Sequence, residues 1–200
     1  PNAAFSFEKR TLYAGPRRTD LSYGVGQVVL GLSGALPYRD WSWQGHVSYG
    51  RTDETRQLTG WTSLSGTQQL LNAPDGGASL CDGGFDPFGM TALSASCLNF
   101  LRRSPKDTSE YSQTDAELNL QGGLLTLPAG EVRFAAGLSF RRNTYAFNPD
   151  SLHISGDVIS PNQAMPTQGR TQVKEVYGEV LIPVLANLPL VRSLELNLGY

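Results

Sequence analysis

The sequence offers few side chains that bind metals or take part in catalysis, and the most reactive are two cysteines and two histidines. Cys81 and Cys97 lie in a stretch with neither a histidine nor a CxxC motif, so the further ligands of a zinc site are missing nearby. His46 occupies a polar position in an alternating segment, and His153 lies in a polar connection. For His46 we favour a solvated or contact-forming side chain over a ligand or general base, and we predict no metal site.

Three acidic residues lie among glycines, in "DGG" and "CDGGFD". Asp75, Asp82 and Asp86 carry the oxygen ligands that Ca²⁺ prefers, but their spacing does not match an EF-hand loop. Asp next to Gly is typical of turns, in which the carboxylate accepts hydrogen bonds from backbone N–H groups. We favour turn-forming, solvated acids, with calcium binding as the alternative.

Motifs of catalysis and nucleotide binding are absent from the sequence. It contains no GxSxG, P-loop, HExxH or GxGxxG pattern, so we expect no catalytic residue, no enzymatic activity and no cofactor. The formal net charge of −2 gives no reason to expect a nucleic-acid partner.

The elements that position these side chains are β-strands. Hydrophobic residues make up 40% of the 200 residues and charged residues only 17%. No apolar run approaches the roughly 20 residues of a membrane helix. The chain is therefore either a soluble β-protein or a membrane protein whose strands carry the weaker, alternating signal.

Seven segments have the alternation and the flanking turn signals of strands. They are residues 3–15, 22–35, 41–53, 111–126, 132–147, 171–184 and 194–200. Short turns follow the second, fourth and sixth segments, and longer polar links follow the others, as in an up-and-down meander. We expect helix only in the longest link, with Leu64–Asn72 as the best candidate.

Each predicted strand has an apolar and a polar phase, so the sheet has two unlike faces. The apolar set is Trp41, Trp43, Val47, Tyr49, Ala116, Leu118, Leu120, Phe134, Ala136, Leu138, Phe140, Val176, Val180, Ile182, Leu194, Leu196 and Leu198. The polar set is His46, Asp115, Glu117, Arg133, Arg141, Glu175 and Glu179. Across the turn "LPAGE" we expect Leu118 opposite Phe140 and Glu117 opposite Arg141, a register that keeps the two phases apart.

The apolar face contacts either a protein core or lipid. Several predicted strands approach 14 residues, whereas strands of globular domains are usually near 5–6 residues. The short turns all lie at one end of the meander, and aromatic residues such as Trp41 and Tyr49 lie near strand ends, as in outer-membrane barrels. These features favour lipid, with a soluble sandwich as the alternative.

Several segments resemble a known family. The most specific is "EVYGEVLIPVLANLPLVRSLELNLGY", and the loop "C…GGFDPFG…C" comes next. Together with "AGPRRTDLSYGVGQVVLGLSGAL…WSWQGHVSYGRTDE" and "LPAGEVRFAAGLSFRRNTYAFNPD", they resemble the barrel of a TonB-dependent outer-membrane receptor, over essentially all of residues 1–200. The resemblance implies an all-β, antiparallel up-and-down meander of about seven long strands, a slice of a 22-stranded transmembrane β-barrel without the receptor's plug domain.

The resemblance also implies a function, a place and partners. The function is TonB-dependent, energy-coupled uptake of a scarce nutrient of the siderophore, cobalamin or saccharide class, in the outer membrane of a Gram-negative bacterium. The implied partners are outer-membrane lipid on the apolar set, the receptor's own plug domain on the polar set and, through the plug, TonB. The links at about 54–109 and 148–169 would be extracellular. The alternatives are a passive or structural outer-membrane barrel and a soluble carbohydrate-binding β-domain.

In the oxidising compartment that the resemblance implies, Cys81 and Cys97 are expected to form a disulfide. By chain-entropy reasoning, a loop of this length contributes roughly 3 kcal/mol.

Overall fold

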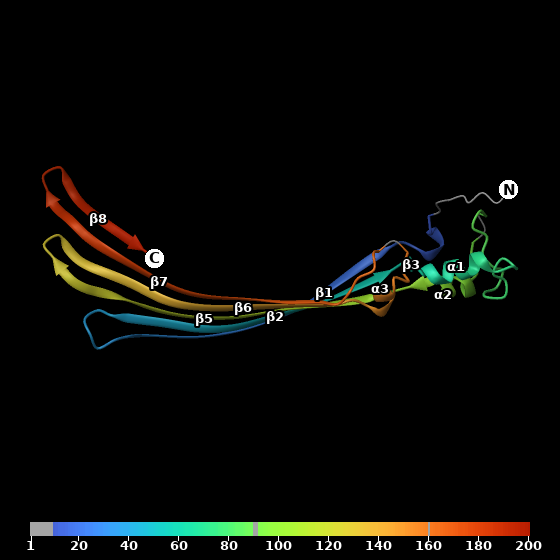
Figure 1. Ribbon diagram of the computed structural model, residues 1–200, viewed down its shortest axis with the longest axis horizontal. Coiled ribbons are helices and arrows are strands. Elements are labelled where there is room, and N and C mark those ends of the chain that lie inside the picture. Colours follow the sequence, from blue (N-terminus) through green and yellow to red (C-terminus); the bar gives the residue numbers. More distant parts are fainter. Residues whose placement is uncertain (1–9, 90–91, 160) are drawn as a thin grey trace. The chain divides into compact units, whose positions relative to one another are not determined.

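A computed structural model of the chain describes residues 10–89, 92–159 and 161–200. Its main element is a six-stranded sheet whose strands follow one another in chain order, as an antiparallel up-and-down meander (Figure 1). The strands are β1 (Arg18–Ala35), β2 (Ser42–Thr59), β5 (Lys106–Leu127), β6 (Gly130–Asn148), β7 (Thr167–Leu188) and β8 (Val191–Gly199). The predicted antiparallel, up-and-down order is thus confirmed, in a mostly β structure whose sheet has six strands where about seven were expected.

Smaller elements occupy the connections. They are the 3₁₀ helix η1 (Leu12–Ala14), strands β3 (Trp61–Thr62) and β4 (Arg102–Arg103), and helices α1 (Leu64–Asn72), α2 (Ala95–Leu101) and α3 (Ser151–Ser155). Helix α1 has the predicted bounds, and it begins where the Ser63 hydroxyl accepts a hydrogen bond from the Gly66 N–H. No helix among the described residues is long and apolar enough to cross a membrane.

Helix α3 was not predicted, because helix was expected only in the longest link. Its cap explains why it forms: the Asp150 carboxylate accepts a hydrogen bond from the Leu152 N–H at the first turn. Gly156 ends the helix with a φ of 73°, in the left-handed conformation that glycine adopts most easily.

The strand predicted at residues 3–15 is wrong over its described part. Residues 3–9 lie outside the described residues, and Leu12–Ala14 form η1. Gly15 then takes a φ of 88°, which suits glycine and ends the 3₁₀ turn before β1. The other strands are longer than predicted, because the prediction stopped where alternation stopped, whereas the backbone ladder requires no alternation.

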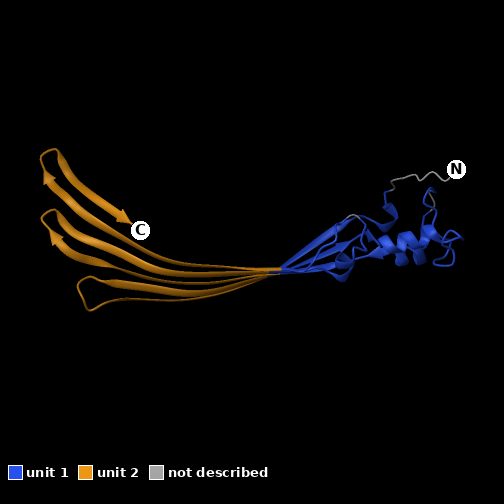
Figure 2. Ribbon diagram, viewed as in Figure 1, with its two compact units in different colours: residues 1–23, 53–109, 146–167 blue, residues 24–52, 110–145, 168–200 orange. Residues whose placement is uncertain are grey.

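The chain divides into two compact units, which are coloured differently in Figure 2. Unit 1 comprises residues 1–23, 53–109 and 146–167, and unit 2 comprises residues 24–52, 110–145 and 168–200. A small core in unit 1 is formed by Leu70, Cys81, Phe85, Cys97 and Leu101. The predicted disulfide between Cys81 and Cys97 lies within this core and is confirmed.

Unit 2 has almost no core of its own. Among its described residues, Val132 is the single buried hydrophobic side chain. Large apolar side chains are instead exposed even on its central strands. Val47 on β2 is 52% exposed, Leu118 on β5 is 48% exposed and Leu138 on β6 is 53% exposed. These side chains are exposed although their strands have neighbours on both sides, because no layer of the described chain covers this face.

Candidate functional site

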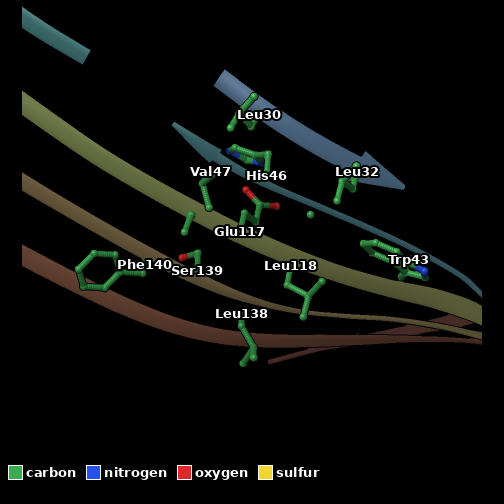
Figure 3. A pocket seen from close by; sticks show the side chains of 12 residues that line it. Leu30, Leu32, Trp43, His46, Val47, Glu117, Leu118, Leu138, Ser139 and Phe140 are labelled. Atoms are coloured by element: carbon green, nitrogen blue, oxygen red, sulfur yellow. The ribbon is translucent and has the colours of Figure 1, made fainter. Parts of the chain in front are cut away.

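One face of the sheet in unit 2 forms an open apolar hollow of about 610 Å³ (Figure 3). Its apolar lining residues are Leu30, Leu32, Trp43, Val47, Ala116, Leu118, Leu138 and Phe140. They come from the four strands β1, β2, β5 and β6, so members of the predicted apolar set from β2, β5 and β6 do gather on one face. A continuous surface of this kind is suited to contact with another apolar phase.

The register of β7 and β8 brings the apolar phases of these strands together. Val180 pairs with Leu198, and Ile182 pairs with Leu196. A bulge between Pro183 and Leu185 shifts the register, so that Leu185 pairs with Leu194. Proline is tolerated beside a bulge, where a ladder hydrogen bond is interrupted anyway.

An aromatic cluster lies at the short-turn end of the sheet. Trp41, immediately before β2, packs edge-on against Tyr38 and Phe134, with ring centroids 5.3 and 4.7 Å away. Its indole N–H donates to the Gly123 carbonyl at 2.8 Å. An indole with one hydrogen-bonded end and apolar neighbours is typical of residues at a membrane–water boundary.

The turn beside this cluster is held by Asp40. Its carboxylate accepts a hydrogen bond from the Gly123 N–H at 2.8 Å. It also forms an ion pair with Arg133 at 2.8 Å. The Gly123 N–H, with a smaller contribution from the Arg133 guanidinium, holds the pKa of Asp40 below its ordinary value despite the opposing effect of desolvation. Arg133, from the predicted polar set, also pairs with Glu131.

On the polar face, side chains from three neighbouring strands meet at Asp115. Arg141 on β6 donates its Nε–H to Asp115 Oδ1 at 3.0 Å, and His46 Nε2 on β2 lies 3.2 Å from Asp115 Oδ2. The expected partner of Arg141 was Glu117, two residues further along β5, so that prediction is wrong. The Arg141 contact is thus displaced by two residues along β5 from the expected one.

The remaining contacts across β5 and β6 agree with this displacement. Ser112 pairs with Thr144 through their hydroxyls, and Gln113 donates to Asn143. Because the displacement is two residues and side chains alternate with period two, each residue keeps its face.

Two glutamates of the predicted polar set lie on β7. Glu175 accepts a hydrogen bond from Ser139 on β6 at 2.9 Å. Glu179 lies opposite Gly199 in the register with β8.

Tyr177, which was not singled out from the sequence, lies over Gly137 on the polar face. A methyl group added at Gly137 would overlap the Tyr177 ring and the Asn119 side chain. The Tyr177 hydroxyl donates to Asn119 Oδ1, and Asn119 Nδ2 donates to Glu117 at 2.7 Å. An aromatic ring covering a strand glycine is one way in which sheets compensate for the missing side chain.

Gly137→Ala is therefore expected to destabilise the folded protein by about 1–3 kcal/mol, because the added methyl group displaces Tyr177 or Asn119. The free energy of unfolding, from urea titration of the purified protein, measures this. Gly178→Ala is the matched control, since its Cβ would meet only the Ala135 carbonyl oxygen, at 4.0 Å. Equal stability of the two variants would contradict the tight fit.

In unit 1, a buried carboxylate holds the second long link against β5. Asp107 is 1% exposed and accepts hydrogen bonds from Arg56 Nη2 at 2.7 Å, His153 Nδ1 at 2.8 Å and the Asp150 N–H at 3.0 Å. Burial alone would raise the pKa of Asp107, but these three donors outweigh it and the pKa lies below its ordinary value.

A second carboxylate, Asp157, joins the two long links. It accepts hydrogen bonds from the Ser63 hydroxyl at 2.8 Å and the Ser65 N–H at 2.7 Å, and it pairs with Arg103 at 3.2 Å. Sequence reasoning singled out neither Asp107 nor Asp157. Of the acids in these contacts, only Asp150 could have been recognised from the sequence, because an Asp that follows a strand and a proline is a common helix N-cap.

The acids of the Gly-rich loop form turns, as favoured from the sequence. Asp75 accepts hydrogen bonds from the Gly77 and Ser79 N–H groups, and Asp86 accepts one from the Phe88 N–H. The backbone N–H of Asp82 donates to the Ser96 hydroxyl.

Comparisons with protein-family models and with curated proteins find no match for this chain.

Proposed function

We propose that this chain is part of a TonB-dependent outer-membrane receptor that takes up a scarce nutrient by energy coupling. The observation that carries the proposal is the uncovered apolar face of unit 2, opposite a polar face with ion pairs and hydrogen bonds. Leucine and valine side chains on central strands are half exposed, and burial of the exposed half in an apolar phase would stabilise each of them by about 0.7–1.5 kcal/mol. Lipid provides that phase.

The sheet's edges also support a barrel. Within the described residues, β1 and β8 each have a single strand neighbour, so each leaves one row of backbone N–H and C=O groups unpaired. Unpaired strand edges are not tolerated in lipid, and closure with further strands removes them. In our proposal these further strands complete the 22-stranded barrel.

The polar face then lines the lumen beside the plug domain. Asp115 and Arg141 are paired with each other, and Glu175 is hydrogen-bonded to Ser139, so these side chains are fixed in place before any partner binds. Such fixed polar groups suit contact with a plug that must be held and later displaced. Unit 1, with its disulfide and its two carboxylate contacts at Asp107 and Asp157, forms the extracellular part that captures the nutrient.

Growth of the bacterium that carries this gene tests the proposal. A ferric siderophore, cobalamin or a saccharide is supplied at limiting concentration, and growth of the gene deletion is compared with that of a TonB-deficient strain. Growth on one of these nutrients is expected to require both genes, and a plasmid copy of the gene should restore it. Uptake that needs this gene but not TonB would contradict energy coupling and favour the passive barrel.

A further inference from the structure

Three potential metal ligands meet on the polar face of unit 2. His46 comes from β2, and Asp115 and Glu117 come from β5. One ligand atom of each lies within 4.8 Å of the others, and all three residues are half-buried. The cluster combines an imidazole nitrogen with two carboxylates, so it is not merely a group of acids.

Neighbouring side chains orient both carboxylates and leave one oxygen of each for a ligand. Arg141 binds Asp115 through Oδ1, so Oδ2 is the oxygen that faces His46 Nε2. Asn119 binds Glu117 through Oε1 at 2.7 Å, which leaves Oε2. Hydrogen bonds of this kind to the outer atoms of ligands fix their geometry in protein metal sites.

Space for water or a further ligand lies beside the cluster. An open hollow of about 400 Å³ is lined by His46 and Glu117 together with Gly31, Ser33 and Gln44. The two carboxylates carry two negative charges, and the Arg141 guanidinium balances one of them. A cation bound here would therefore meet a site with a net negative charge and room to complete its coordination.

We propose that His46, Asp115 and Glu117 bind a divalent transition-metal ion, for which Zn²⁺ is the best match. Zn²⁺ accepts nitrogen and carboxylate oxygen ligands, and sites with three protein ligands leave a fourth position for water. Ca²⁺ and Mg²⁺ prefer oxygen ligands alone, and Ca²⁺ takes six to eight of them. The ion would replace the contact between His46 and Asp115 and add a side-chain link to the existing backbone pairing of β2 with β5.

This site was missed from the sequence, where His46 was assigned a solvated or contact-forming role. The long link between β2 and β5 separates His46 from the acids, and only strand pairing brings them together. The signal that sequence reasoning could have used is the shared polar phase of the three residues.

Calorimetric titration of the purified full-length protein with Zn²⁺, after removal of metal by a chelator, tests the site. His46→Gln and Glu117→Gln are each expected to weaken Zn²⁺ binding at least tenfold, since loss of a ligand should cost no less than loss of its hydrogen-bond partner. Glu131→Gln is the matched control on the same face, because Glu131 pairs with Arg133 and not with the cluster. Its affinity for Zn²⁺ should equal that of the unchanged protein.

Unaltered affinity in both His46→Gln and Glu117→Gln, or no saturable binding by the unchanged protein, would overturn the proposal. Folding of every variant is checked by circular dichroism, so that a misfolded variant is not counted as a loss of the site. The inference goes beyond the proposed uptake function and does not depend on it. If the protein proves soluble without detergent, the same titration is performed in plain buffer.

Discussion

In the proposed outer-membrane setting, Leu138→Arg is expected to abolish most assembly of the protein, whereas Ser139→Arg should leave assembly near normal. The two residues are neighbours on β6 and lie on opposite faces. Both residues border the hollow, but side chains alternate along a strand, and the Ser139 hydroxyl is hydrogen-bonded to Glu175. An arginine facing lipid near the bilayer midplane costs about 2–4 kcal/mol. An arginine at position 139 would face water and the Glu175 carboxylate, so its cost should be small.

The same pair of variants discriminates lipid from solvent. Leu138 is already 53% exposed in this chain, so in a water-soluble protein its replacement by arginine would remove little packing and change stability by less than about 0.5 kcal/mol. Assembly is measured as the fraction of the protein in the outer-membrane fraction that migrates as folded barrel in unheated gels. Equal assembly of the two variants, or a greater loss with Ser139→Arg, would mean that the apolar face does not contact lipid.

Asp107→Ala is expected to release the second long link, at a cost of about 3 kcal/mol. The substitution leaves the His153 Nδ1–H and the Asp150 N–H without their acceptor, and it removes the ion pair of Arg56. Removing one partner from a buried ionic network costs about 3–5 kcal/mol, and the lower end applies because Arg56 is partly exposed. Hydrogen exchange of residues 150–157, followed by mass spectrometry, should accelerate accordingly.

Glu110→Gln is the control for this variant. It disrupts an exposed ion pair with Arg51 on neighbouring strands, which is worth about 0–1 kcal/mol. Hydrogen exchange of residues 150–157 should be unchanged in Glu110→Gln. A similar acceleration in both variants would show that Asp107 has no special role.

The same contact predicts a dependence on pH. Because the folded-state pKa of Asp107 lies below its ordinary value, the ionised carboxylate stabilises the fold above the unfolded-state pKa of about 3.9. This stabilisation is lost as the pH falls through the lower, folded-state pKa. Protection of residues 150–157 should therefore decrease in acid in the unchanged protein, and Asp107→Ala should weaken that dependence without removing it, because the pKa values of Asp150 and Asp157 are also lowered.

The predictable part of this structure rests on local patterns. Strand alternation placed Leu118, Leu138 and Phe140 in one phase, and the structure gathers them around one hollow. Helix α1 has the bounds expected for Leu64–Asn72, the best helical candidate of the longest link, and Ser63 caps its first turn. Periodicity and caps depend only on neighbouring residues, which is why a sequence reveals them.

The unpredicted part consists of contacts between distant residues. Arg56, Asp107 and His153 meet although long segments separate them, and none of the three stands out in its own segment. The side-chain partners across β5 and β6 are displaced by two residues from the expected ones, so that Arg141 contacts Asp115 instead of Glu117. Such a displacement leaves each side chain on its predicted face, but it changes the partner of an individual ion pair such as that of Arg141.

The disulfide in unit 1 has a consequence for the order of biogenesis. It joins Cys81 and Cys97 within a single link, beside α1 and α2, so the contacts that it closes are local. Local contacts form early, whereas the pairing of β2 with β5 must wait for the whole link to be synthesised. In the proposed setting, the bond would form in the periplasm, where thiols are oxidised. Insertion of the strands into the membrane would then require a loop that is already cross-linked to cross the bilayer.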